Sequence, residues 1–342
     1  MKISIPDARR LAVEVFNRAG MQPKHSAIVA DHIIYAEASG EAAGGLARVL
    51  SVVEEFRDRP RATPILIEQQ TRSSAVVDGG GHTGYVTSVV AMDKAIQLAK
   101  ETDFGLVGMR NSWFSGQLAY YVERAANAGF IAIHCTNAKA RVAPTGGIDA
   151  ILGTNPITFG FPADPRPIVI DIGTSAVTVA ELMIRQKLGK PLAPNVGIDR
   201  DGHPTIDPAA AWTGAILPWG GHRGYGIALA VQLLGILAGG APVARDVAES
   251  GFFFLVINPE LLMPRAEFRA KASELVRHIE RSRPAPDVEK VRVHGMASAR
   301  RREASYARGH FEIDAAVHQM LLEMREGRFK PPSLSNREGV GQ

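Results

Sequence analysis

The sequence predicts a mixed α/β protein of the α+β type, in which amphipathic helices flank a central sheet. Two observations lead to this class. Apolar residues recur at helical spacing near both ends of the chain, and the middle carries short apolar runs bounded by Gly, Pro, Asn and Asp. The 342 residues suffice for one elaborate domain or two intertwined ones, and 46% hydrophobic with 22% charged residues is ordinary globular usage.

Helices are predicted throughout the first seventy residues. Pro6 and Asp7 precede apolar residues at helical spacing that end at Gly20, and the same spacing recurs over residues 26–38 and 46–56. We therefore expect an N-terminal helical layer over residues 1–72, packed with helices from the 225–342 segment. Within that segment, residues 264–282 and 313–328 read as surface helices, and the polar tail after residue 329 is expected to be poorly ordered.

The middle of the chain predicts a sheet. Helices over residues 89–100 and 118–128 separate some of its apolar runs, and a domain over residues 73–224, completed by a strand near 251–258, is expected. The stretch HRGYGIALAVQLLGILAGG opens on glycines and continues with about four turns of apolar residues, so it is predicted as a buried helix, shorter than the roughly 18 uncharged apolar residues that a membrane span needs. The expected strands are SSAVVD, FGLVGMR, GFIAIHC, ITFGFP, PIVIDIG and GFFFLVIN.

Composition and missing motifs exclude several classes of protein. The net charge of +4 is spread along the chain, so a nucleic-acid partner is not expected, and no apolar run suggests a membrane partner or a secretory signal. The single Cys135 rules out an intrachain disulfide. The chain lacks a dinucleotide glycine fingerprint, a phosphate-binding P-loop, a zinc-binding helix motif and a nucleophile elbow. We expect a cytoplasmic protein without a catalytic metal.

Several loop motifs lie where the predicted strands end. Their Gly, Pro, Asn and Thr residues can turn backbone amides toward a ligand such as a dinucleotide pyrophosphate, although ordinary connecting loops have the same composition. The triplet Arg300, Arg301 and Arg302 is likewise either a solvated face or a site for the 2′-phosphate of NADP. The motifs are RNSWFSG, NAKARVAPTGG, LGTNPITFG, DIGTS and DPAAAWTGAILPWGGHRGYG.

These segments, in this order, resemble the malate/L-lactate dehydrogenase-like family, and the resemblance runs from about Arg10 to Val317. LGTNPITFGFP, DIGTS, GIDRDGHPTIDP and LPWGGHRGYGIALAVQLL are its most specific parts. Within the family, the residues discussed below make the chain resemble most the Δ1-piperideine-2-carboxylate/Δ1-pyrroline-2-carboxylate reductases. The resemblance implies a non-Rossmann mixed sheet that binds NADP or NAD, a helical domain interleaved with it, and a homodimer.

The resemblance also implies roles for particular residues. Arg48 corresponds to the arginine that pairs with the substrate carboxylate, and Thr154 to the residue that hydrogen-bonds the substrate. Glu181 falls where reductases of the family carry an aspartate coupled to the catalytic histidine. Arg223 replaces the usual lysine, and together with the arginine triplet it favours NADP. The implied cofactor contacts are Phe114, Ser115, Gly116, Gln117, Leu118, Asp171, Ile172, Gly173, His222, Arg223 and Gly224.

Two histidines of the family pattern are missing. The family's Ser-His-Gly motif is Ala43-Gly44-Gly45 here, and the histidine of its Asn-Ser-x-His motif is Phe114. Reduction of a ketone leaves an alkoxide that needs a proton, whereas an iminium is already charged and needs none. Glu181, His222, His82 and Tyr85 are candidate substitute acids, although a structural role suits each of them.

Three hypotheses follow. The first is an NAD(P)H-dependent reductase of the C=N bond of a small carboxylated imine, in which Phe114 offers an aromatic face to the cation. The second is a 2-hydroxy acid dehydrogenase of malate or lactate type that uses a displaced acid. The third is a cofactor-binding protein that has lost its chemistry together with the histidine.

Overall fold

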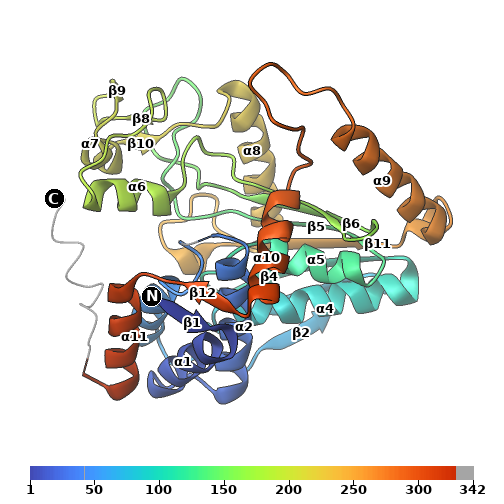
Figure 1. The fold of residues 1–342 in the computed structure, drawn as a ribbon, viewed down its shortest axis with the longest axis horizontal. Helices are drawn as coiled ribbons and strands as arrows, with labels where there is room; N and C mark the ends of the chain where they lie inside the picture. Colours follow the sequence, from blue (N-terminus) through green and yellow to red (C-terminus); the bar gives the residue numbers. More distant parts are fainter. Residues whose placement is uncertain (42, 329–342) are drawn as a thin grey trace.

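The computed structural model describes residues 1–41 and 43–328, so the tail expected to be poorly ordered lies outside the described residues. A seven-stranded sheet with the strand order β2-β3-β4-β11-β5-β6-β7 forms its centre (Figure 1). Only β3 and β4 pair in parallel, and the other neighbours are antiparallel, which confirms the mixed α/β class. The strands are β2 (Leu66–Gln69), β3 (Ser74–Asp78), β4 (Phe104–Arg110), β5 (Ile131–Thr136), β6 (Ile157–Phe161), β7 (Ile168–Ile172) and β11 (Phe252–Ile257).

Helices cover both faces of this sheet, and β11 at its centre shows why. Successive side chains of a strand point to opposite faces. Phe252 and Phe254 pack in a core with α4 (Gly84–Thr102) and α5 (Ala119–Asn127). Phe253 and Leu255 pack in another core with Cys135 and the buried side of α8 (His222–Leu237). Because both of its faces are covered, β11 has apolar side chains at every position.

The N-terminal helices form a separate apolar core beside the sheet. α1 packs against α2, α3 and α11, and α10 packs against α2. The two ends of the chain also meet through β1 and β12, which pair antiparallel. This grouping joins helices of the first and last segments, but β2 lies before residue 72 and belongs to the sheet. The elements are β1 (Lys2–Ser4), α1 (Ile5–Arg18), α2 (Pro23–Ala38), α3 (Arg48–Asp58), α10 (Met296–Arg308), β12 (His310–Glu312) and α11 (Ala315–Glu326).

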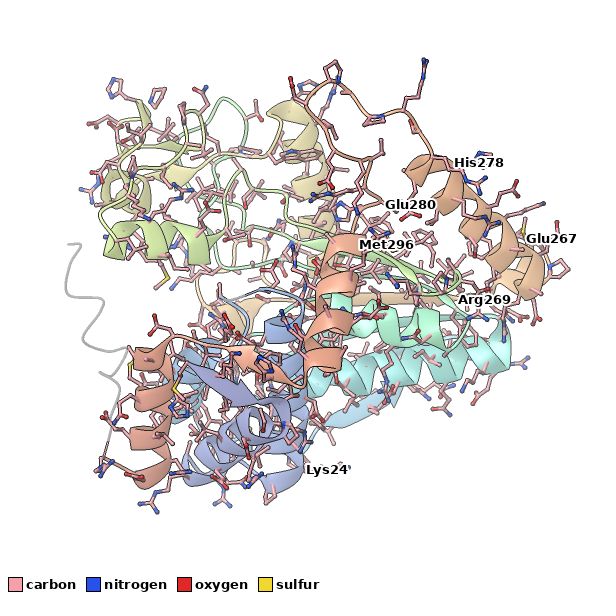
Figure 2. The ribbon with its side chains drawn as sticks, in the orientation of Figure 1. Lys24, Glu267, Arg269, His278, Glu280 and Met296 are labelled. Carbon is pink, nitrogen blue, oxygen red and sulfur yellow. The ribbon has the colours of Figure 1, made fainter. Side chains whose placement is uncertain are left out.

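A small third group of elements, α6, α7 and β8 to β10, lies at the upper left of Figure 1. It has its own apolar cluster. On the opposite side, α9 carries Glu267, Arg269 and His278 on its surface, and the following segment leads to Met296 at the start of α10 (Figure 2). The remaining elements are α6 (Val179–Lys187), β8 (Gly197–Ile198), β9 (Pro204–Thr205), α7 (Pro208–Thr213), β10 (Ala215–Ile216), η1 (Val247–Glu249), η2 (Pro259–Leu261) and α9 (Arg265–Glu280).

Helix α8 corrects one prediction. It was expected to be buried, but only the side with Ala228 and Val231 is covered, by β5 and β11. Leu233 and Leu237 on its other side are 58% and 71% exposed. α8 therefore packs on the sheet with one apolar side and leaves a second apolar side uncovered in the single chain. Among the described residues, no helix combines the length and apolar character that a membrane crossing requires.

Candidate functional site

The loop after β4 connects the sheet to the N-terminal helical core. Phe114 and Gly116 have positive φ angles of 44° and 67°, a conformation that costs energy for a residue with a side chain. The Thr83 hydroxyl donates to the Phe114 carbonyl oxygen at 3.2 Å, and a Cβ on Gly84 would lie 3.1 Å from the same oxygen. The start of α4 thus presses closely on residues 114–118, which we call the 114–118 loop.

Arg48 lies directly against this loop. The guanidinium carbon of Arg48 is 4.3 Å from the centre of the Phe114 ring, in a cation–π arrangement. No carboxylate within the described residues forms an ion pair with Arg48, which is half-buried at the start of α3. Its N–H groups are therefore available to an anion from outside the protein. The stacking also means that Arg48 already covers one face of Phe114.

Glu37 holds the chain that leads into Arg48. Its carboxylate accepts a hydrogen bond from the backbone N–H of Leu46 at 2.8 Å, and burial raises its pKa. A Cβ at Gly45 would lie 2.0 Å from a Glu37 oxygen, so a side chain at that position would displace the carboxylate from its present place. Glu37 thus fixes the segment in which the expected histidine is replaced by Gly44.

Asp171 connects the end of β7 to the same loop. One carboxylate oxygen accepts the backbone N–H of Ala119 at 3.0 Å, and the other accepts the Thr158 hydroxyl at 2.7 Å. Burial raises the pKa of Asp171, and these two hydrogen bonds oppose the rise. The carboxylate is therefore engaged within the protein at the N-terminus of α5, where the helix dipole also favours negative charge.

The other expected site segments, which contain Thr154, Gly173 and the start of α8, are connected to one another by backbone contacts. The Thr174 hydroxyl donates to the Thr154 carbonyl at 3.0 Å, next to Gly173, whose α-carbon is exposed. The Thr174 carbonyl accepts the N–H of Trp219 at 2.8 Å. A Cβ on Gly224 would meet the Trp219 carbonyl at 1.9 Å, so the start of α8 folds tightly onto this turn. The structure thus links Arg48, the 114–118 loop, residues 171–173, Thr154 and residues 222–224.

Two other predictions do not join this group. Glu181 lies on the exposed surface of α6 and accepts a hydrogen bond from Arg185 at 2.9 Å. The arginine triplet is used within the fold, because Arg300 pairs with Glu280, Arg301 donates to the Ser39 carbonyl, and Arg302 pairs with Glu123. The triplet therefore bridges α10 to neighbouring elements. Arg300 and Arg301 are exposed, as expected of a solvated face, while all three guanidinium groups already have partners within the protein.

The residues behind the 114–118 loop were not singled out from the sequence. His32 of α2, Tyr121 of α5 and Glu37 contact the backbone of the candidate site through hydrogen bonds. The available signal was weak: a histidine at a buried position of a helix, and a tyrosine within YYVERAA, are ordinary core residues. Only the packing of α2 against α4 and α5 brings them to the loop.

Comparison with known proteins identifies the family. The model of the malate/L-lactate dehydrogenase family matches residues 3–322. The chain is 34% identical to malate dehydrogenase of Pyrococcus horikoshii, covering 86% of this chain and 87% of the relative. It is 33% identical to L-sulfolactate dehydrogenase of Methanocaldococcus jannaschii, covering 92% and 94%.

Solved structures show the same fold. The sulfolactate dehydrogenase structure from Methanocaldococcus jannaschii superposes with a TM-score of 0.85 at 30% identity, covering 96% of this chain and 97% of that one. Δ1-Piperideine-2-carboxylate reductase from Pseudomonas syringae has a TM-score of 0.85 at 27% identity, covering 95% and 99%. The expected special nearness to such reductases is not supported, since the reductase is one similar structure beside malate and sulfolactate dehydrogenases. The chain belongs to the malate/L-lactate dehydrogenase family.

Proposed function

We propose that the protein is an NAD(P)-dependent oxidoreductase that interconverts a small 2-hydroxy carboxylic acid and the corresponding 2-oxo acid. The observation that carries the proposal is Arg48: a half-buried guanidinium without a carboxylate partner among the described residues, stacked on Phe114 of the 114–118 loop. Stacking holds the plane of the guanidinium while leaving its N–H edge free, which suits bidentate recognition of a carboxylate. The related malate, sulfolactate and lactate dehydrogenases favour this chemistry.

The start of α8 supports binding of the cofactor phosphates. Gly220 and Gly221 adopt positive φ, no side chain caps the helix, and His222 and Arg223 are exposed. The free N–H groups of a helix N-terminus, together with a cation, favour a phosphate. We propose that residues 222–224 hold the phosphates and that the backbone of residues 171–173 faces the cofactor, since the Asp171 carboxylate is engaged elsewhere. Arg223 alone now favours NADP over NAD, because the arginine triplet is occupied.

Each residue of the candidate site has a proposed role in the reaction. A bound reduced nicotinamide supplies the hydride. Arg48 binds the substrate carboxylate, and the Thr154 hydroxyl, which makes no hydrogen bond within the described residues, is free to bind the substrate oxygen. None of the ten histidines hydrogen-bonds to or stacks on Arg48 or Phe114 in the described structure. The alkoxide left by hydride transfer to a 2-oxo acid therefore takes its proton from a displaced acid, and His82 is one candidate, because the hydroxyl of the next residue, Thr83, donates to the Phe114 carbonyl. The role of Glu181 as a catalytic residue stays a prediction.

Reduction of a small carboxylated imine is the second candidate. Gly44 at the position of the family histidine favours it, because an iminium needs no added proton to accept a hydride. The argument from the Phe114 face is weaker than the sequence suggested, since Arg48 already covers one side of that ring. The relatives named above therefore favour 2-hydroxy acid chemistry over imine reduction.

Oxidation of NADH and NADPH, followed by absorbance, distinguishes these functions. Pyruvate, oxaloacetate and glyoxylate are compared with Δ1-piperideine-2-carboxylate at matched concentrations. Faster turnover of a 2-oxo acid supports the main proposal, and faster turnover of the imine reverses the order. Binding of NADPH by calorimetry without turnover of any substrate identifies a protein that has kept the cofactor and lost the chemistry.

We also propose that the chain forms a homodimer. The uncovered side of α8 supports this, because Leu229, Leu233 and Leu237 recur at helical spacing and are exposed in the single chain. Contiguous exposed apolar residues of this kind are characteristic of an interface. Light scattering after gel filtration gives the mass directly, and a monomer at micromolar concentration would contradict the proposal.

A further inference from the structure

The loop that carries Phe114 is held from behind by buried side chains of two helices. The backbone N–H of Gln117 donates to Nε2 of His32 at 2.9 Å. The Tyr121 hydroxyl donates to the Ser115 carbonyl at 2.6 Å. His32 comes from α2 and Tyr121 from α5, so the loop is tied to the helical core and to the sheet at once.

His32 is an unusual residue for this place. It is fully buried among the rings of Tyr85, Tyr120 and Tyr121, whose centres lie 4.6 to 5.4 Å from its own. Burial lowers its pKa to about 3, so the ring is neutral near pH 7. Because Nε2 accepts the Gln117 N–H, the proton of the neutral ring resides on Nδ1, which finds no hydrogen-bond partner within the described residues.

Stability alone does not account for this arrangement. Three of the seven buried polar side-chain atoms without partners in the described structure border the loop: His32 Nδ1, Tyr85 hydroxyl oxygen and Gln117 Oε1. An apolar side chain at position 32 would remove one of them, but it would leave the Gln117 N–H without an acceptor. A fixed acceptor for that N–H is therefore what the histidine supplies.

The loop cannot easily shift while His32 is in place. A Cβ on Gly116 would lie 2.6 Å from His32 Nε2 and 2.3 Å from the Tyr85 ring. Gly116 therefore sits on the surface formed by these two rings, and Phe114 is held in its positive-φ conformation two residues earlier. Since Arg48 stacks on Phe114, the position of the guanidinium depends on the same contacts.

We infer that His32 is a positioning residue: its neutral imidazole holds the 114–118 loop through Gln117 and thereby sets where Phe114 and Arg48 meet the substrate. The inference rests on the proposed function, because it assumes that this loop and Arg48 form the reaction site. His32 contacts neither Arg48 nor Phe114 by hydrogen bond or ring stacking, so its effect passes through the loop.

The test compares His32→Leu, which removes the acceptor, with His32→Gln, whose amide oxygen can take the place of Nε2. The leucine variant is expected to lower kcat about tenfold or more, while the Kd for NADPH, measured by calorimetry, changes less than about threefold. The glutamine variant is expected to recover kcat to within about threefold of the unaltered protein. His134→Leu is the matched control, because His134 is equally buried but binds the Phe253 carbonyl in β11.

Hydrogen exchange by mass spectrometry adds a readout that does not need activity. Peptides covering residues 114–118 should exchange faster in His32→Leu than in His134→Leu, with peptides of β11 unchanged by His32→Leu. A folded leucine variant with unaltered kcat and exchange, or a glutamine variant no better than the leucine one, overturns the inference.

Should the leucine variant not fold, His32→Asn, whose shorter amide cannot reach Gln117, takes its place. If the unaltered protein binds neither dinucleotide, the proposed function fails, while exchange still decides whether His32 holds the loop.

Discussion

Replacement of Arg48 by methionine tests the carboxylate site most directly. Methionine keeps much of the apolar stem and removes the guanidinium. If Arg48 makes two charge-assisted hydrogen bonds to the substrate, each worth about 1.5–3 kcal/mol, their loss lowers kcat/KM by about 10²- to 10⁴-fold. Arg48→Lys keeps a charge but loses the bidentate geometry and the planar stack on Phe114, so a smaller loss of about 10- to 100-fold is expected.

The same replacement should affect folding much less. Loss of the cation–π contact with Phe114 costs about 0.5–2 kcal/mol of the free energy of unfolding, measured by urea denaturation. The Kd for NADPH should stay nearly constant, because its proposed phosphate contacts lie at residues 222–224. Arg9→Met is a suitable control, since Arg9 forms an exposed ion pair with Asp31. Retention of kcat/KM within about threefold in Arg48→Met would refute the assignment of Arg48 to the substrate carboxylate.

Three further predictions concern packing, assembly and pH. Gly116→Ala should lower the free energy of unfolding by about 1–3 kcal/mol in urea titrations, because the added Cβ would overlap Tyr85 and His32. Gly81→Ala introduces the same left-handed strain, but the nearest atom to its Cβ is 4.0 Å away, so it should lower the free energy of unfolding less. Equal losses in the two variants would contradict this packing. Leu233→Arg should convert the dimer to monomer in light scattering, and Leu262→Arg, at a still more exposed leucine outside α8, should not. Burial lowers the pKa of His134 from 6.5 to about 4. Between these two values the unfolded chain binds a proton that the folded protein excludes, so the stability present above pH 6.5 is lost as the pH falls toward 4. The unfolding free energy should therefore fall by about 2 kcal/mol less between pH 7 and 5 in His134→Leu than in the unaltered protein, and an unchanged pH dependence would contradict the burial of a neutral ring.

Much of the sheet could be predicted because its signals are local. The run FGLVGMR is β4, and GFFFLVIN contains β11, because a strand covered on both faces must be apolar at successive positions. Gly and Asn at the ends of these runs mark turns for the same local reason. The order of the strands could not be read this way. β11 follows β4 by more than a hundred residues and yet lies between β4 and β5.

The motifs of the family also selected the segments of the candidate site. In the structure, Arg48, the 114–118 loop, residues 171–173, Thr154 and residues 222–224 are linked by contacts, and their roles stay predictions. The contacts inside that group could not be predicted. The Asp171 carboxylate accepts the Ala119 N–H at the N-terminus of α5, a contact that arises from the packing of β7 against α5, and the contact of residues 171–173 with the cofactor stays a prediction.

By itself, the sequence determined most strands of the central sheet, several of the helices that flank it, the family and the missing histidine at Gly44, since each depends on residue types and short spacings along the chain. Only the tertiary structure decided that Arg48 stacks on Phe114, that His32 stands behind the loop, and that Arg302 pairs with Glu123. Each of these contacts joins residues more than sixty positions apart. Their geometry depends on how α2, α3, α5 and α10 pack against one another, and no local pattern carries that information.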